Sequence, residues 1–310
     1  MSKILITGGA GYIGSMLVDS LVKASFDVTV LDIQKYDVNS LSHLCSYKNF
    51  DFINGDVCDE ELISSLLPKF EYIFPLACLV GAPLCDKFPK EAQSVNEDAI
   101  KLMLKHVNDS HKIIYPTTNS GYGTKDGGYL CDENSTLAPI SLYGKTKVNS
   151  EKLVLDSKQG VTIRLATVFG SSFRTRYDLL VNDFVRRAYF DKKIDLYESH
   201  FTRNFVHISD VISGLIFVMN NFSKLKGHAF NLGLDSANIS KLDLVKKIQF
   251  YIPELSYSEN SKQKDPDQRN YIVSNEKIAK AGFRASVSLD DGIVEMIKAV
   301  KMENNFNQNV

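Results

Sequence analysis

The sequence predicts an α/β fold, in which a doubly wound parallel sheet is joined to a smaller, partly discontinuous C-terminal lobe. Three observations support this prediction. Short apolar segments alternate with helix-length segments through the first half of the chain, which is typical of parallel strands joined by crossover helices. The first apolar segment runs into a glycine-rich turn, and the second ends at an acidic residue. The alternation stops after Arg164, where a long irregular stretch begins.

We expect strands and helices to alternate in chain order. The strands are predicted at 3–7, 27–31, 51–54, 71–76, 111–116 and 161–166, and the helices between them at 12–24, 59–67, 91–108 and 143–157. Later elements are predicted at 178–190, 209–220 and 289–301 (helices) and at 229–232 (a strand). We assign residues 1–166 and 205–233 to a nucleotide-binding domain, and residues 167–204 and 234–310 to the second lobe. Ligands of such folds bind at the carboxyl ends of the strands.

Residues 7–14, Thr-Gly-Gly-Ala-Gly-Tyr-Ile-Gly, form the most informative motif. Gly8 allows a tight turn, Gly11 lets a pyrophosphate approach the backbone, and Gly14 lets the helix pack closely on the strand. The free N–H groups at the start of the helix attract phosphate. The alternative is a turn that binds nothing, but the strand before the motif and the helix after it favour a Rossmann-type dinucleotide site.

Asp32 ends the second predicted strand, eighteen positions after Gly14. A carboxylate at this position accepts hydrogen bonds from the ribose hydroxyls, and its charge repels the 2′-phosphate of NADP. The sequence therefore predicts NAD as the cofactor.

Composition excludes several classes of protein. The net charge of the 310 residues is −1, so no global basic field attracts nucleic acid or an anionic membrane. No apolar run approaches the roughly 20 residues that span a bilayer. The sequence begins directly with a predicted core strand, so we expect no signal peptide. Its five cysteines are odd in number and contain no Cys-x-x-Cys, so we expect a cytoplasmic protein with reduced thiols and no metal site.

Tyr143 and Lys147 are four residues apart at the start of a predicted helix, so their side chains share one face. An ammonium group beside a phenol favours the phenolate and is expected to lower the pKa of the phenol. A tyrosine with such a pKa can exchange a proton with a substrate hydroxyl. Thr118 follows the strand 111–116 at the same cleft and can bind that hydroxyl. The alternatives are an exposed helix pair and a threonine that serves only the turn.

At these residues the chain resembles the extended short-chain dehydrogenase/reductases that modify nucleotide-diphosphate sugars. Residues 7–14 match the cofactor loop of that family, and Thr118, Tyr143 and Lys147 match its catalytic residues in order and spacing. The resemblance covers nearly the whole chain. It implies an NAD-dependent enzyme whose C-terminal lobe binds a nucleotide-diphosphate sugar.

The resemblance also implies roles for residues outside these motifs. Asp56 is expected to contact the adenine, and Asn96 to be structural. The other cofactor positions implied in this way are Tyr12, Ile13, Ile33, Val57, Leu76 and Ala77, although Pro75 stands where a histidine is usual. The substrate positions implied are Val80, Gly81, Thr118, Asn119, Ser120, Asn182, Arg203 and Arg269, with the two arginines on the diphosphate. We expect Arg174 and Arg176 to be solvated and His207 to be structural.

One departure from the family limits the reactions that we expect of this chain. Dehydratases of the family carry an acidic side chain directly after the catalytic threonine, whereas this chain has Asn119 and Ser120. Neither side chain titrates usefully near neutral pH, so elimination of water lacks its acid and base. Oxidation at a ring carbon, C4 by resemblance, remains. We favour a C4 dehydrogenase; a C4 epimerase stays open, and so does a catalytically silent NAD-binding sensor or scaffold.

Two further expectations follow from the resemblance. The strand end at 116–123 is similar to that of bacterial capsule and surface-sugar enzymes, including enzymes that act on GDP-manno-heptose. A homodimer or a dimer of dimers is implied, with helices 91–108 and 143–157 at the interface. Their apolar residues are Ile100, Met103, Leu104, Val107, Val148, Leu153 and Val154. The alternative is that these residues only cover the sheet.

Overall fold

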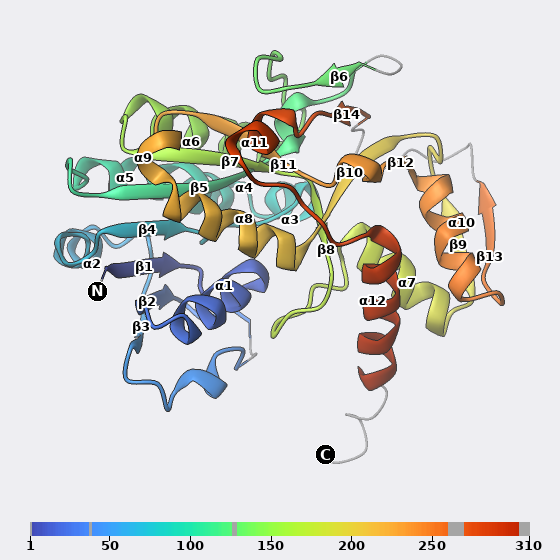
Figure 1. The fold of residues 1–310 in the computed structure, drawn as a ribbon, viewed down its shortest axis with the longest axis horizontal. Coiled ribbons are helices and arrows are strands. Elements are labelled where there is room, and N and C mark those ends of the chain that lie inside the picture. Colours follow the sequence, from blue (N-terminus) through green and yellow to red (C-terminus); the bar gives the residue numbers. More distant parts are fainter. Residues whose placement is uncertain (1, 37–38, 126–128, 260–269, 304–310) are drawn as a thin grey trace.

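The computed structural model describes residues 2–36, 39–125, 129–259 and 270–303. Its centre is a sheet of seven parallel strands, and the first strand of the chain lies inside this sheet and not at an edge (Figure 1). From one edge to the other the strands are β3 (Phe50–Asn54), β2 (Asp27–Asp32), β1 (Lys3–Thr7), β4 (Tyr72–Pro75), β5 (Lys112–Thr118), β7 (Gly160–Leu165) and β11 (Ala229–Leu232). The direction of winding reverses between β1 and β4, which opens a crevice at the carboxyl ends of these strands. The predicted doubly wound α/β fold is confirmed.

Helices cover both faces of the sheet because strand residues alternate between the two sides. In β1, Ile4 and Ile6 pack in one core and Leu5 packs in the other. The first core is closed by α1 (Tyr12–Lys23), α8 (Ile208–Asn220), α9 (Phe222–Leu225) and α11 (Glu276–Ala281). The second core is closed by α2 (Glu60–Leu66), α5 (Ala99–Lys105) and α6 (Leu142–Asp156). These layers leave the carboxyl edge of the sheet uncovered for a ligand.

The helix predicted at 91–108 differs in the structure. It begins at Pro89 as α4 (Pro89–Gln93), widens into a π turn at Ser94–Asp98, and continues as α5. A shorter helix, α3 (Ala82–Lys87), precedes it. Apolar residues keep a helical spacing through this break, so the periodicity of the sequence does not predict the π turn.

The smaller lobe lies to the right in Figure 1 and has its own core. Three helices build most of it, namely α7 (Leu180–Phe190), α10 (Lys241–Tyr251) and α12 (Leu289–Glu303). Its strands are β8 (Thr167–Phe169), β10 (Thr202–His207) and β12 (Asn238–Ser240) in one sheet, and β9 (Lys193–Leu196) and β13 (Ser256–Glu259) in another. A further pair joins β6 (Leu130–Cys131) to β14 (Ile272–Val273).

Two segments lie differently from the predicted division of the chain. The second half of β10 was expected in the nucleotide-binding domain, but this strand pairs with β8 and β12 outside the large sheet. Helix α11 was expected in the smaller lobe, but its Ile278 packs in a core of the large sheet. Within the described residues, none of the helices is long and apolar enough to cross a membrane.

Candidate active site

A cavity of about 1090 Å³ lies at the carboxyl ends of the large sheet, where the smaller lobe meets it. It is lined by the segments that follow β1, β2, β4 and β5 and by residues of α6, α7 and β10. Most of the predicted site residues belong to this lining. They are Gly8, Gly11, Tyr12, Ile13, Gly14, Asp32, Ile33, Asp56, Val57, Leu76, Ala77, Val80, Gly81, Thr118, Ser120, Tyr143, Lys147 and Arg203.

The glycine-rich turn forms a cradle that tolerates no side chains at its tightest points. Gly8 has a φ of +70°, and a Cβ there would lie 2.5 Å from the backbone nitrogen of Ala77. A Cβ on Gly14 would lie 2.4 Å from the carbonyl oxygen of Gly8. The turn therefore brings α1 against β1 and points the helix N-terminus at the cavity, as a dinucleotide pyrophosphate requires.

Asp32 is fixed at the end of β2 by two backbone donors. The N–H of Ala10 donates to its Oδ2 at 3.0 Å, and the N–H of Gln34 donates to its Oδ1 at 2.8 Å. Each carboxylate oxygen keeps a further lone pair for a ribose hydroxyl. The cradle and this carboxylate together fit an NAD molecule.

Helix α6 carries two of the predicted catalytic residues into the cavity. Its N-cap, Ser141, accepts a hydrogen bond from the N–H of Gly144 at 3.1 Å, so the helix begins just before Tyr143. Lys147 follows one turn later on the same face. Its Nζ lies 3.9 Å from the centroid of the buried Tyr115 ring, and this cation–π contact holds the ammonium in place.

Thr118 lies at the last position of β5, two residues further than the predicted end of the strand. Its Oγ1 accepts a hydrogen bond from the N–H of Ser120 at 3.1 Å and lies 2.8 Å from the Oγ of Ser120. Thr118 therefore starts the 3-10 turn Asn119–Tyr122 and also lines the cavity.

The expected lowering of the Tyr143 pKa is wrong for this structure. Burial raises the pKa of the phenol above its usual range, and the nearby Cys78 adds to this shift. The Lys147 ammonium lowers the pKa, but by less than burial raises it. Burial therefore opposes the phenolate more than Lys147 favours it, and the sequence argument failed because it considered the charge without the loss of solvent.

Asn96 has the structural role that the resemblance implied. Its Oδ1 accepts from the N–H of Leu79 at 2.8 Å, and its Nδ2 donates to the Leu79 carbonyl at 3.0 Å. Ser150 of α6 donates to the backbone carbonyl of Asn96 at 2.7 Å. The π turn thereby holds the loop 76–81 along the cavity.

Arg174 and Arg176 were expected to be solvated, but both line the cavity. Arg174 lies over the ring of Tyr36, 3.7 Å from its centroid. Arg176 donates from its Nε to Asp178 at 3.0 Å, and its side chain is 16% exposed. Their position in the sequence, between the strands of the large sheet and the first helix of the substrate lobe, could have indicated that they lie at the cavity.

Three predicted substrate residues do not belong to the described lining. Asn119 is buried behind it. Asn182 is buried as well, and its amide is engaged by the backbone of Gly170 and Arg176. This fixes the loop that carries Arg176 and leaves Asn182 no group for a ligand. Arg269 lies outside the described residues.

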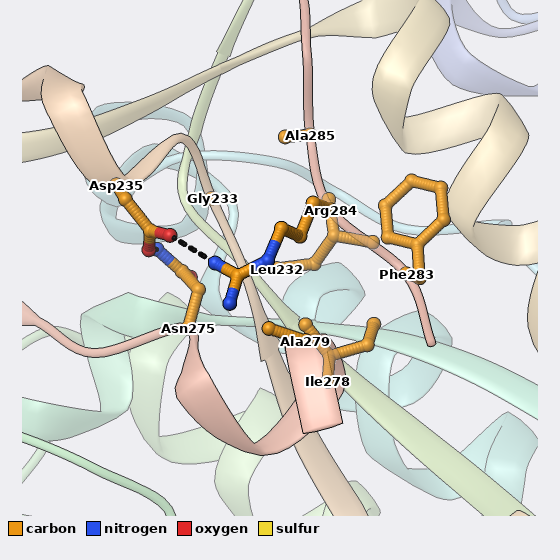
Figure 2. Close-up of a pocket in the computed structure, with 9 residues that line it drawn as sticks. All are labelled: Leu232, Gly233, Asp235, Asn275, Ile278, Ala279, Phe283, Arg284 and Ala285. Carbon is orange, nitrogen blue, oxygen red and sulfur yellow. Dashed lines mark hydrogen bonds and ion pairs between the residues drawn. The ribbon is translucent and has the colours of Figure 1, made fainter. Parts of the chain in front are cut away.

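A second hollow lies beside α11 and is lined in part by Gly233, Asn275 and Arg284 (Figure 2). Arg284 donates to Asp235 across it at 3.1 Å. Its volume is about 10 Å³, which holds about one water molecule and no larger ligand.

Residues 4–233 match the model of the NAD dependent epimerase/dehydratase family. The chain belongs to this family. The membership confirms NAD as the cofactor and agrees with the cradle and with Asp32. It also makes the protein a member of a family of enzymes that act on nucleotide sugars.

Several proteins of known name are similar to the chain over nearly its full length. The CDP-paratose 2-epimerase of Salmonella typhi is 28% identical, with 95% of this chain and 98% of the relative covered. The dTDP-glucose 4,6-dehydratase of an Actinoplanes strain is 27% identical, with 95% and 96% covered. The UDP-glucuronic acid 4-epimerase of Bacillus cereus, solved with UDP-glucuronic acid and NAD, is 26% identical with a TM-score of 0.84, and 97% and 99% are covered. These relatives differ in reaction, so family membership leaves the reaction of this chain open.

Proposed function

We propose that this protein oxidises the C4 hydroxyl of a nucleotide-diphosphate sugar and releases a 4-keto sugar nucleotide. The observation that carries the proposal is the meeting of Thr118, Tyr143 and Lys147 in one cavity with the dinucleotide cradle. Bound NAD supplies the hydride acceptor for the hydrogen on C4. We assign the diphosphate to Arg203, a buried residue of β10 that lines the same cavity.

The chain's own groups would move the hydroxyl proton. Thr118 binds the C4 hydroxyl, and the Tyr143 oxygen takes its proton as the carbon loses its hydrogen. Tyr143 must first lose its own phenol proton to solvent, and because burial raises the pKa of the phenol, the share of phenolate depends on a nearby cation. Lys147, on the next turn of α6, provides that charge.

Loss of water is disfavoured by the two positions after Thr118. Asn119 and Ser120 carry no carboxyl group to protonate a leaving hydroxyl or to take a proton from carbon. A C4 epimerase is the second candidate, because the similar Bacillus cereus structure is a 4-epimerase. Both reactions share the first oxidation and differ in whether the hydrogen is returned to C4.

Product analysis separates these reactions. Purified protein is incubated in heavy water with CDP-, dTDP-, UDP- and GDP-linked sugars, and the products are analysed by mass spectrometry and NMR. GDP-manno-heptose belongs in the panel, because the sequence resemblance suggests it and a role in bacterial surface-polysaccharide synthesis. Loss of two hydrogen atoms supports the dehydrogenase. Unchanged mass with inverted C4 supports the epimerase. Loss of water with deuterium on carbon contradicts both, and no turnover supports a sensor or scaffold.

We also propose a homodimer or a dimer of dimers formed through α5 and α6. Three of the predicted interface residues cannot contribute to this interface, because they are buried against the sheet within one chain. They are Ile100, Met103 and Val154. Leu104 is half-buried against the same core, whereas Leu153 is half-buried outside it and remains available. Light scattering at micromolar concentration should show at least two chains, and Leu153→Glu should reduce the measured mass. A monomeric wild-type protein would contradict this proposal.

A further inference from the structure

We propose that Arg164 is a positioning residue that sets the relative placement of Thr118 and Tyr143. It does so by binding α6, which carries Tyr143, and the turn Asn119–Tyr122, which Thr118 caps. The inference deepens the proposed C4 oxidation and rests on it for its kinetic consequences. Arg164 does not belong to the described lining of the cavity, so it acts through other residues.

The first link joins Arg164 to α6. Its Nε donates to both carboxylate oxygens of Glu151, at 3.0 and 3.2 Å, and its Nη2 donates to Oε1 at 2.6 Å. Both side chains are almost fully buried. Glu151 lies one helical turn after Lys147 and two turns after Tyr143, so it anchors the face of α6 that carries both residues.

The second link joins Arg164 to the turn after Thr118. Its Nη1 donates to the hydroxyl of Tyr122 at 3.0 Å. Tyr122 is fully buried and ends the 3-10 turn that Thr118 caps. The Tyr122 hydroxyl in turn donates to Asn231 of β11 at 2.7 Å. The end of this turn is therefore tied to two strands of the sheet.

A single guanidinium makes both links, and its planar shape fixes the angle between them. Its N–H groups point in set directions, unlike the three donors of a lysine ammonium on a flexible stem. The buried, charge-assisted bonds are short and directional. Movement of the turn relative to α6 must therefore break a hydrogen bond to Arg164. Because proton transfer from a hydroxyl bound by Thr118 to Tyr143 depends on their separation, the link sets the rate of that step.

Tyr122→Phe tests the link most cleanly, because it removes one hydroxyl and keeps the ring. The matched control is Tyr72→Phe. Tyr72 also accepts a hydrogen bond from a cation, Lys112 at 3.2 Å, but it lies on β4 away from the cavity. We expect Tyr122→Phe to lower kcat about tenfold with KM and NAD affinity unchanged, because small misplacements cost rate without loss of binding. The control should keep the wild-type kcat.

Arg164→Lys provides an independent variant that keeps the charge beside Glu151. It should lower kcat as Tyr122→Phe does, and the double variant should lower kcat no further, because both changes break the same link. Should Arg164→Lys fail to fold, Tyr122→Phe still decides. Additive effects of the two changes, or a Tyr122→Phe enzyme with the wild-type kcat, would overturn the proposal.

Hydrogen exchange gives a readout that needs no substrate. In Tyr122→Phe the amides of 120–123 should exchange faster than in the wild type and in Tyr72→Phe, because local opening no longer breaks the Arg164 bond. If the wild type turns over no sugar nucleotide, the proposed function fails, while this measurement still tests the link. Unchanged exchange at 120–123 would overturn the link even in an active enzyme.

Discussion

The guanidinium of Arg174 lies 3.7 Å from the centroid of the Tyr36 ring, and this contact joins the two lobes beside the cofactor cavity. Arg174 comes from the loop after β8, and Tyr36 from the segment after Asp32. A second contact between the lobes stacks the ring of Phe173 on that of His43, with centroids 4.2 Å apart. Side chains of the two lobes are thus in contact beside the cofactor end of the cavity.

We expect Arg174→Ala to accelerate the release of NAD about fivefold, since a cation–π contact contributes roughly 1 kcal/mol. Displacement of bound NAD followed by stopped-flow fluorescence measures the rate. Arg284→Ala is the matched control, because Arg284 also pairs across the protein surface but lies away from this cavity. An equal release rate in both variants would show that the bridge does not limit exchange.

Tyr143→Phe should lower turnover by a factor on the order of 10² to 10⁴, the usual contribution of a positioned acid–base group. The ring remains, so the fold and the affinity for NAD should be unchanged by calorimetry. Thr118→Val should reduce turnover less, because Thr118 orients the hydroxyl and carries no proton away. A Tyr143→Phe protein with the wild-type rate would favour the sensor or scaffold alternative.

Lys147→Met should raise the pKa of Tyr143 further, because its ammonium opposes the effect of burial more strongly than the other nearby cation, Arg176. Phenolate absorbance, taken as the difference between each protein and its Tyr143→Phe counterpart, measures this pKa. Lys145→Met is the control, since Lys145 is exposed on the same helix. A shift of the same size in the control would mean that a general change of charge, rather than Lys147, tunes the phenol.

Glu295 of α12 ties the smaller lobe to the loop after β8. Burial alone would raise its pKa, but His207 and both donors of Ser171 lower it to about 2. The carboxylate accepts from the Ser171 N–H and Oγ at 2.8 Å each, and His207 Nε2 lies 3.1 Å from it. His207 is therefore structural, as the sequence analysis expects.

The sign of the pH effect follows from this lowered pKa. Stability from Glu295 is complete above the ordinary glutamate pKa and is lost as the pH falls from there towards 2. Glu295→Gln should therefore lower the denaturation midpoint at pH 7 and differ less from the wild type at pH 3. Glu61→Gln, at an exposed position of α2, is the control. An equal loss at both pH values would contradict an electrostatic role.

The sheet and the cofactor cradle were predictable because each depends on local sequence. Strand β11 begins and ends where the apolar run 229–232 predicts, and Gly14 is required by a contact with the backbone of Gly8, six residues before it. The placement of Thr118 and Tyr143 in one cavity was predictable for the same reason, since both follow from strand ends and helix starts.

Features that depend on distant packing were not predictable from local sequence. The pKa of Tyr143 reflects burial by several segments. A prediction from the single neighbour Lys147 therefore gave a pKa shift in the wrong direction. The position of Arg174 depends on Tyr36, far away in the chain. Asn182 resembled a ligand residue, but its amide is used to hold the backbone of a neighbouring loop.

The π turn at Ser94–Asp98 allows the shape of the loop 76–81 to change independently of the helices that pack on the sheet. A π turn contains one residue more than the α-helix around it needs. Removing one residue there would join α4 and α5 into a continuous helix whose apolar face still meets the sheet, but it would abolish the Asn96 clamp on Leu79. A lineage can therefore gain or lose this loop geometry by a change of one codon, without remodelling the hydrophobic layer beneath it.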